Sequence, residues 1–363
     1  MVRVQTGDRI LLATVVGLVL FGVVMVYSSS AIMAQQLYGD QFHFLIKQAM
    51  AALLGIAAMI ALMNFDYLNL KRPAVVYGLL GLSIFLLVLV LFLPVTKGTH
   101  RFIRLVGFSF QPSELAKIAL IVFLAYYLEK RVEEIKSIKR TFVPCAVAAA
   151  IMMGLILLGK DLGTTFVLAL VVGIMLIVAG VPLRYLLACT LPALPLLYWQ
   201  LFHVPYRLER LKAFLDPWRY ARDEGFQVVQ SLIAVGSGGI HGLGLAQGRQ
   251  KFFYLPEAHT DFIYAVVGEE LGLVGAATVV LFFVIFLWRG LRAARSAPDS
   301  FGNLLAIGLT TMLATQALFN ISVVLSLVPA KGIPLPFISY GGSSLLISLL
   351  SVGVLLNLSQ HVE

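Results

Sequence analysis

The segment FYLPEAHTDFIYAVVGEELG, residues 253–272, joins a polar, aromatic run to an apolar stretch that continues to residue 288. Asp261 ends the polar run, and Glu269 and Glu270 lie inside the apolar stretch. An ionised side chain inside a membrane helix costs about 2.5 to 3.5 kcal/mol on insertion scales. A membrane segment that keeps several carboxylates therefore indicates a functional site.

Composition places the chain in a membrane. Of its 363 residues 60% are hydrophobic and 12% are charged, and the mean hydropathy is +0.94, which excludes an ordinary soluble domain. A membrane helix needs about 20 apolar residues, and it satisfies all its backbone hydrogen bonds within the span. We therefore predict an all-α polytopic membrane protein with a bundle of about ten transmembrane helices. The predicted spans are 10–29, 43–63, 73–94, 113–128, 141–158, 162–180, 184–203, 262–288, 301–325 and 338–358.

The distribution of Lys and Arg predicts the orientation of the bundle. Most basic residues of the short loops lie near residues 3–9, 71–72, 130–140 and 289–295. Basic loops stay in the cytoplasm, so both termini are expected to be cytoplasmic. Residues 1–363 then form a single transmembrane domain with one long extracytoplasmic loop, about 204–260, in which we expect short interfacial helices. The net charge of +9 includes basic groups in the outer loops, which suggest an anionic ligand on that face.

The two cysteines offer no further chemistry. Cys145 and Cys189 both fall in predicted spans, so they predict neither a disulfide framework nor a metal site. The expected environment is the membrane, and no nucleic acid partner is expected.

Several motifs, in order along essentially the whole chain, resemble the SEDS family, which comprises RodA, FtsW and SpoVE. They are VYSSS (26–30), GFSFQPSELAK (107–117), DLGTT (161–165), FLDPWR (214–219), LPEAHTDFIYAVVGEELG (255–272) and PLPFISYGGSS (334–344). The resemblance implies a glycosyltransferase of the bacterial cytoplasmic (inner) membrane that polymerises lipid II into peptidoglycan. It also implies a class B penicillin-binding protein as the transpeptidase partner.

Asp261 is the first candidate catalytic residue, because it stands where the outer loop meets a membrane helix. The resemblance implies an inverting displacement with undecaprenyl pyrophosphate as the leaving group, which needs a base for the acceptor hydroxyl and positive charge for the pyrophosphate. Asp261 can serve as that base or bind a divalent cation, Mg²⁺ or Mn²⁺, that bridges the pyrophosphate. The structural alternative is that Asp261 only caps the helix that follows.

Glu114 and Lys117 are the other candidate catalytic residues. They are three residues apart, so they share one face of the predicted helix that begins near Pro112. Lys117 can contact the pyrophosphate while Glu114 orients it or shares the acid and base chemistry. Alternatively, the two charges only neutralise each other, because pairing lowers the cost of keeping both in a membrane helix.

The candidate substrate-binding residues are weaker. Arg101 and Arg219 carry the planar guanidinium that suits pyrophosphate oxygens, and the alternative for either is a solvated loop residue. His259 can orient Asp261 or be a bystander, and Ser343 can bind a sugar hydroxyl or only allow close helix packing. Glu269 and Glu270 lie deeper, where one is expected to be protonated or to pair with Lys47, and the alternative for both is a structural role.

Two other classes of function stay open on the sequence. A lipid II flippase can use similar charged helices, but it needs polar groups through the whole membrane and access from both faces. A scaffold that only activates a penicillin-binding protein does not need Asp261. Within the family, the very short cytoplasmic tails favour RodA, and hence cell elongation and rod shape together with other membrane proteins of an elongation complex.

Overall fold

The computed structural model describes residues 7–94, 100–105, 108–202, 205–252, 254–329 and 331–360, and nearly all of them are helical. Its α-helices are α1 (Arg9–Tyr38), α2 (His43–Met63), α3 (Pro73–Phe92), α4 (Pro112–Lys130), α5 (Val143–Leu158), α6 (Leu162–Val178), α7 (Leu183–Phe202), α8 (Pro205–Leu215), α9 (Phe226–Gly238), α10 (Ile263–Arg295), α11 (Ser300–Val324) and α12 (Gly342–Ser359). The shorter elements are η1 (Tyr67–Lys71), β1 (Ile103–Leu105), β2 (Phe108–Phe110), η2 (Val132–Glu134) and η3 (Ile138–Phe142).

Each of the ten predicted spans is a helix in the structure, so the predicted fold class is confirmed. Among the described residues, 7 helical segments are long and apolar enough to cross a membrane by their own composition. Two that fall short have clear reasons. α4 carries Glu114, Lys117, Glu129 and Lys130, and it is buried along most of its length inside the bundle. α6 has only 17 residues.

α1 is longer than predicted, because the sequence after Val26 continues the helix instead of ending it. The hydroxyls of Ser29 and Ser30 donate to the backbone carbonyls of Met25 and Val26, one turn earlier. These polar side chains therefore have hydrogen-bond partners inside the helix. The helix ends where Gly39 adopts a left-handed conformation with φ of 72°. The 30-residue helix therefore reaches about 45 Å, well beyond a single apolar span.

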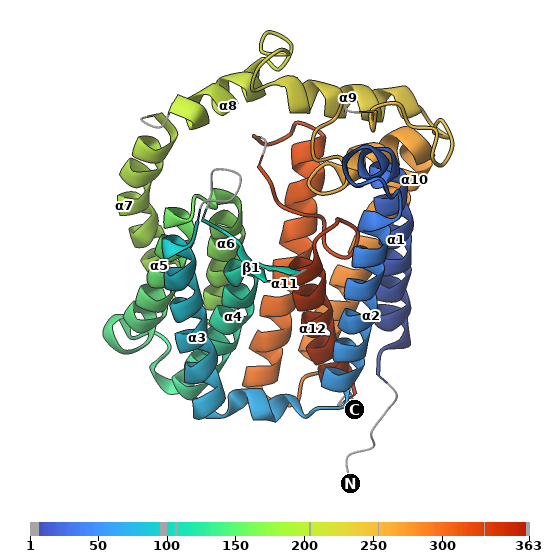
Figure 1. Ribbon diagram of the computed structural model, residues 1–363. Helices are drawn as coiled ribbons and strands as arrows, with labels where there is room; N and C mark the ends of the chain where they lie inside the picture. Colours follow the sequence, from blue (N-terminus) through green and yellow to red (C-terminus); the bar gives the residue numbers. More distant parts are fainter. Residues whose placement is uncertain are drawn as a thin grey trace.

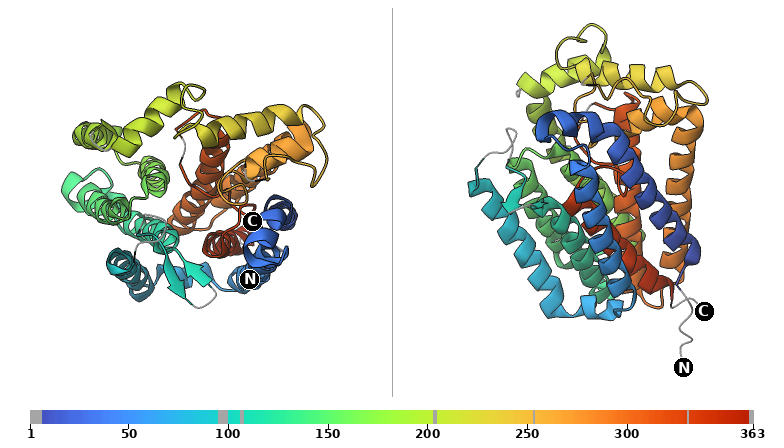
Figure 2. Two further views of the ribbon diagram at one scale, coloured as in Figure 1. Left: turned by 45° about the horizontal axis from the view of Figure 1, so that its top comes forward. Right: turned by 45° about the vertical axis from the view of Figure 1, so that its right-hand side comes forward.

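α11 is the central element of the bundle. It packs against α4 and α6 on one side and against α10 and α12 on the other. Figures 1 and 2 show α3 to α6 grouped beside it on one side and α1, α2, α10 and α12 on the other. Side chains on α11 can therefore reach both halves of the molecule.

The first and last helices meet at one end of the bundle, at the bottom of Figure 1. The backbone N–H of Asp8 donates to the Ser359 hydroxyl at 3.0 Å. This common end agrees with the prediction that both termini lie on one side, and we refer to it as the cytoplasmic end. The opposite end is the outer end.

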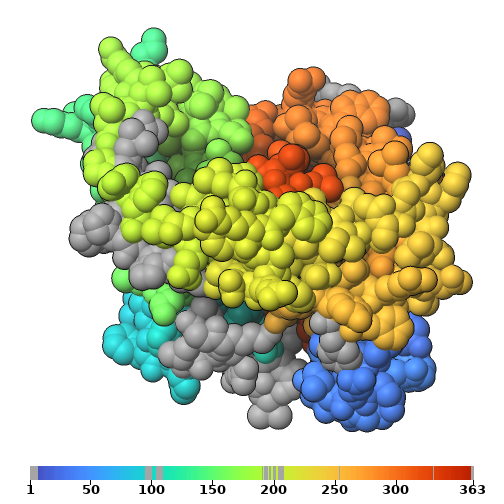
Figure 3. Space-filling view, turned by 90° about the horizontal axis from the view of Figure 1, so that it is seen from above, coloured from blue at the N-terminus to red at the C-terminus, as the bar shows by residue number. Residues whose placement is uncertain are grey.

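Two short helices cover the outer end, as predicted for the long extracytoplasmic loop. α8 and α9 lie across the top of the bundle in Figures 1 and 2. Seen from above, they form a band, and beside it lies a hollow between the green atoms of the α5 to α7 region and the orange-red atoms of α11 (Figure 3). Trp218 and Tyr254 are exposed in this outer segment, as expected of residues at headgroup level.

Two features depart from the predicted pattern of straight helices and short turns. Residues 103–110 contain the antiparallel pair β1 and β2, in which Ile103 faces Phe110. α10 is broken at Gly272, whose φ of 66° is not helical. A side chain at Gly272 would meet the backbone of Ile240 and Gly242, so glycine allows the chain after α9 to lie directly on the kink.

Candidate active site

Asp261 lies at the outer end, immediately before α10, and is half-buried. α10 begins at Ile263, and its N-cap is Phe262. Asp261 therefore stands one position before the N-cap, and the alternative that it caps this helix is wrong. The position of its carboxylate needs another explanation.

Three consecutive carbonyls fix the backbone at Asp261. The carbonyl of His259 accepts from Tyr340 N at 2.9 Å, and that of Thr260 accepts from the Ser339 hydroxyl at 2.6 Å. The carbonyl of Asp261 itself accepts from Asn320 Nδ2 at 2.8 Å. All three donors come from α11 or from the loop between α11 and α12, so that region determines where Asp261 stands.

The carboxylate of Asp261 lies against the backbone of the same loop. A Cβ built on Gly332 would be only 2.5 Å from Asp261 Oδ2. Glycine at this position therefore leaves the space that the carboxylate occupies.

His259 is buried beside Asp261 in an aromatic cluster. Its ring lies 4.7 Å from Phe44 and 5.6 Å from Tyr340, measured between ring centroids. Phe44 is at the start of α2 and also contacts Tyr38 at the end of α1. The outer ends of α1 and α2 thus support the segment that carries Asp261.

Glu114 and Lys117 form a buried ion pair near the outer end of α4. Lys117 Nζ lies 3.0 Å from Glu114 Oε1, and each side chain is only 3% exposed. The ammonium also donates to Gln316 Oε1 on α11 at 2.8 Å. The second carboxylate oxygen, Glu114 Oε2, is buried and has no hydrogen-bond partner among the described residues. Such an acceptor is costly unless water or a ligand supplies a donor.

Arg101 lies beside the N-terminus of α6. It donates to the carbonyl of Lys160, and its Nη1 is 3.9 Å from Asp161 Oδ1. Asp161 caps α6 through the N–H of Thr164 at 3.1 Å and accepts from Gln111 Nε2 at 3.2 Å. Gln111 directly precedes α4, so this cluster holds Arg101 close to the helix that carries Glu114.

Glu269 and Glu270 face the chain that follows α9. Glu269 accepts from the N–H of Arg249 at 2.7 Å. Glu270 forms an ion pair with Lys251 at 2.7 Å and accepts from the Ser28 hydroxyl at 2.6 Å. The expected pairing with Lys47 is wrong, since the partner is Lys251. Both carboxylates bind groups of the protein itself, and a role in substrate binding stays a prediction.

For two predicted residues, the structure describes no contact with any other candidate residue. Arg219 is exposed in the turn between α8 and α9, where its N–H donates to Asp216 at 3.2 Å. Ser343 is buried in the first turn of α12. Their substrate-binding roles stay predictions.

The structure adds four buried polar residues that were not predicted from the sequence as site residues. They are Asp161, Lys251, Gln316 and Asn320. Gln316 and Asn320 are spaced i, i+4 on an otherwise apolar helix, which places them on one face. The i, i+4 spacing of two amides on an apolar helix could have indicated a polar contact face, but the sequence does not show which residues that face contacts.

Among the residues that the structure describes, no group of three or more His, Cys, Asp and Glu side chains converges on one point. A dedicated metal centre made by the protein alone is therefore not formed there. Mg²⁺ often takes one or two carboxylates and completes its shell with substrate phosphates and water. Asp261 fits only that mode of binding.

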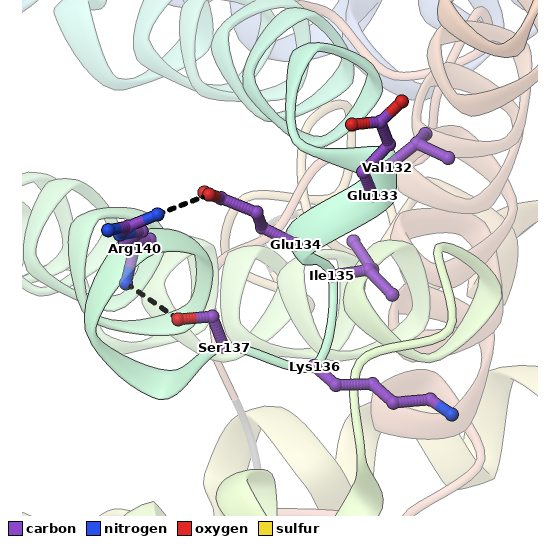
Figure 4. Close-up of a pocket in the computed structure, with 7 residues that line it drawn as sticks. All are labelled: Val132, Glu133, Glu134, Ile135, Lys136, Ser137 and Arg140. Carbon is purple, nitrogen blue, oxygen red and sulfur yellow. Dashed lines mark hydrogen bonds and ion pairs between the residues drawn. The ribbon is translucent and has the colours of Figure 1, made fainter.

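A cavity among the described residues lies beyond the end of α4 that is opposite Glu114 and Lys117. It has a volume of about 510 Å³ and is lined by Val132, Glu133, Glu134, Ile135, Lys136, Ser137 and Arg140. Figure 4 shows the Arg140 guanidinium directed toward Glu134 in this cavity, while the backbone N–H of Arg140 donates to the Ser137 hydroxyl. It follows α4 in the connection to α5, at the cytoplasmic end, so it is separate from the Asp261 region.

Comparison with known proteins gives a consistent result. The model of the cell cycle protein family that includes FtsW, RodA and SpoVE matches residues 8–363. A curated relative from Geobacter sulfurreducens, named a probable peptidoglycan glycosyltransferase FtsW, is 46% identical over 365 residues, which is 99% of this chain and 97% of the relative.

Solved structures show the same fold over nearly the full length. A chain from a peptidoglycan synthase complex, described as coordinating polymerization and crosslinking, has a TM-score of 0.79 at 32% identity and covers 98% of both chains. The rod shape determining protein RodA of Thermus thermophilus has a TM-score of 0.71 at 28% identity, with 98% of this chain and 97% of RodA covered.

Proposed function

This chain belongs to the SEDS family of FtsW, RodA and SpoVE, and we propose that it is a peptidoglycan glycosyltransferase that polymerises lipid II. It is a multi-pass protein of the inner membrane. A curated relative is named a probable peptidoglycan glycosyltransferase. The observation that carries the proposal is the half-buried Asp261 at the outer end, which does not cap α10 and whose backbone is fixed by three hydrogen bonds.

In the proposed reaction, the acceptor hydroxyl attacks the anomeric carbon of a lipid-linked donor and inverts it. The new bond joins that oxygen to the carbon, the bond to the pyrophosphate oxygen breaks, and the lipid pyrophosphate leaves with the electron pair. Asp261 accepts the hydroxyl proton as general base. Lys117 stabilises the charge that develops on the leaving group, and Arg101 binds the pyrophosphate. In the alternative role, Asp261 would hold a divalent cation, which would supply positive charge for the pyrophosphate.

The buried ion pair suits this role of Lys117. An ammonium in a water-excluded site interacts with developing negative charge more strongly than it would in water. Glu114 holds the ammonium in place while no substrate is bound. Its second oxygen remains an acceptor that a substrate hydroxyl or water can satisfy.

The alternative, a lipid II flippase, requires access from both faces of the membrane. At the cytoplasmic end, Arg289 pairs with Asp8 at 2.6 Å, and Lys71 contacts Glu129 at 2.8 Å and Asp299 at 3.2 Å. These contacts tie the ends of α1 and α10 together and join η1 to α4 and α11. The predicted site residues lie instead toward the outer end, which favours chemistry at that surface.

We propose a class B penicillin-binding protein as the partner. Support comes from the similarity to a chain of a peptidoglycan synthase complex described as coordinating polymerization and crosslinking.

The branch within the family is a separate question. Higher identity to proteins named FtsW than to RodA favours the FtsW branch over the elongation role predicted from the short tails. Complementation of cells depleted of their own RodA or FtsW tests this choice.

The deciding experiment measures glycan strands made from purified lipid II by the protein in complex with its transpeptidase partner. We expect wild type and the exposed control Asp223→Asn to polymerise and Asp261→Asn to lose activity by at least about 10²-fold, the lower range for a general base. Folding and partner binding must match among the three. Equal activity of Asp261→Asn would remove the proposed base. Transport of labelled lipid II into liposomes without any polymerisation would favour the flippase.

A further inference from the structure

Two buried amides on α11 connect the two halves of the candidate site. Asn320 is 1% exposed and donates from Nδ2 to the carbonyls of Asp261 at 2.8 Å and Ile333 at 2.7 Å. Because both acceptors are carbonyls, the orientation of this amide is fixed, and Asn320 Oδ1 points away without a hydrogen-bond partner among the described residues.

Gln316 lies one turn earlier on the same face of α11 and is 2% exposed. Its Oε1 accepts from Lys117 Nζ at 2.8 Å, and its Nε2 donates to the carbonyl of Pro334 at 3.1 Å. The amide therefore holds a charged group of α4 and the loop before α12 at the same time.

We infer that Asn320 and Gln316 are positioning residues that set the place of Asp261 relative to Lys117. α4 and α10 each pack on α11, and these two amides carry the described polar contacts from α11 to two of the candidate catalytic residues, Asp261 and Lys117. Both amides also donate to carbonyls of the loop at residues 333–334. The loop and the two catalytic groups are therefore joined to α11 in one hydrogen-bonded unit. The inference rests on the proposed function, in which a base and a cation act on opposite sides of one reacting carbon.

Such positioning matters because a displacement of about 1 Å in a reacting group can cost about 10²-fold in rate. Loss of an amide that only positions other groups lowers kcat more than it changes KM, since the substrate-binding groups stay in the chain. A residue needed only for folding gives a different result, a lower amount of active protein with unchanged constants.

The first test compares Asn320→Leu and Gln316→Leu with Thr310→Val, a matched control. Thr310 is also buried on α11, its hydroxyl has no partner among the described residues, and it touches neither Asp261 nor Lys117. For the folded fraction of each complex, we expect kcat for lipid II polymerisation to fall at least about tenfold in both Leu variants, with KM within about twofold. The Thr310→Val variant is expected to match wild type.

A second variant, Asn320→Asp, gives a readout that a general loss of stability does not produce. An ionised carboxylate there would face two carbonyl oxygens, whereas a protonated carboxyl can donate to one of them. The kcat of Asn320→Asp, divided by that of wild type, is therefore expected to rise as the pH is lowered from 8 to 6. A ratio that is independent of pH would overturn the inference.

Backbone hydrogen exchange tests the geometry without any turnover. Asn320→Leu should speed exchange at residues 257–263 and 331–335, and Thr310→Val should not. Unchanged exchange, or unchanged kcat in both Leu variants while wild type polymerises, overturns the positioning role and leaves the proposed function intact. If wild type does not polymerise, the proposed function fails, and the exchange data still decide whether the amides hold the two segments.

Discussion

Lys251 Nζ lies 2.7 Å from Glu270 Oε1, and the two side chains are 3% and 0% exposed. Glu270 also accepts from the N–H of Ala246 at 3.0 Å, and its neighbour Glu269 accepts from that of Arg249. The first part of α10 therefore holds the chain that follows α9 by charge-assisted hydrogen bonds. This explains why two adjacent carboxylates persist next to an apolar stretch.

Removing one partner of this buried pair should be strongly destabilising. Lys251→Met leaves the carboxylate of Glu270 without its cation, which typically costs about 3 to 5 kcal/mol. We expect a clear fall in the thermal unfolding temperature of the detergent-solubilised protein. The double variant Lys251→Met with Glu270→Gln should recover part of the loss, because no buried charge is then left alone.

The control for this pair is Lys212→Met, which removes an exposed lysine of the same outer segment. It should change the unfolding temperature little, because exposed charges contribute little. A Lys251→Met variant as stable as this control would show that the pair does not hold the segment.

Gly332 provides a test of the space around Asp261. Gly332→Ala would place a Cβ 2.5 Å from Asp261 Oδ2, so the carboxylate must move. We expect polymerisation to fall by at least about tenfold, given how steeply rate depends on the position of reacting groups, while the protein stays folded. The measurement is initial rate at saturating lipid II.

Gly341→Ala is the matched control, from the same loop. The nearest atom to its added Cβ is 3.7 Å away, an ordinary contact, and its φ of 170° suits any residue. This variant should keep the wild-type rate. Equal rates for Gly332→Ala and Gly341→Ala would mean that the position of the carboxylate does not limit the reaction.

Asp161 is predicted to act through Arg101. Asp161→Asn keeps an oxygen that can cap α6 but removes the negative charge beside the guanidinium. Arg101 should then be held less firmly, so we expect KM for lipid II to rise by about tenfold, equivalent to about 1.4 kcal/mol of binding, with little change in kcat.

The control Asp40→Asn changes an exposed outer aspartate, whose carboxylate accepts a hydrogen bond from the N–H of Phe42 in the same loop. If both variants keep the wild-type KM, Arg101 does not bind the pyrophosphate in the way proposed.

The positions of the membrane helices and the candidate catalytic side chains could be predicted from the sequence. Apolar length predicted every span, because a bilayer requires continuous helices. The i, i+3 spacing predicted that Glu114 and Lys117 share one helix face, with an ion pair between them as one alternative. Partners that are distant in the chain could not be predicted. Nothing in the periodicity links Glu270 to Lys251 rather than to Lys47, or Asp261 to Asn320, because those contacts depend on the kink at Gly272 and on how α11 is packed.

The cytoplasmic network around Lys71 should stabilise the fold without serving the reaction. Burial lowers the pKa of Lys71, but its hydrogen bonds and charge interactions with Glu129 and Asp299 outweigh burial, so the pKa is raised overall. A raised folded-state pKa contributes stability that is fully present below the unfolded-state pKa, about 10.4, and is lost as the pH rises through the folded-state value. We therefore expect Lys71→Met to lower the unfolding temperature at pH 8 and the difference from wild type to shrink above about pH 10.4. Arg72→Gln, an exposed neighbour, is the control and should unfold like wild type.

Polymerisation at neutral pH should persist in Lys71→Met, since this network lies at the end of the bundle opposite Asp261. Loss of polymerisation at full folding would show instead that the cytoplasmic end takes part in turnover, and it would reopen the transport alternative.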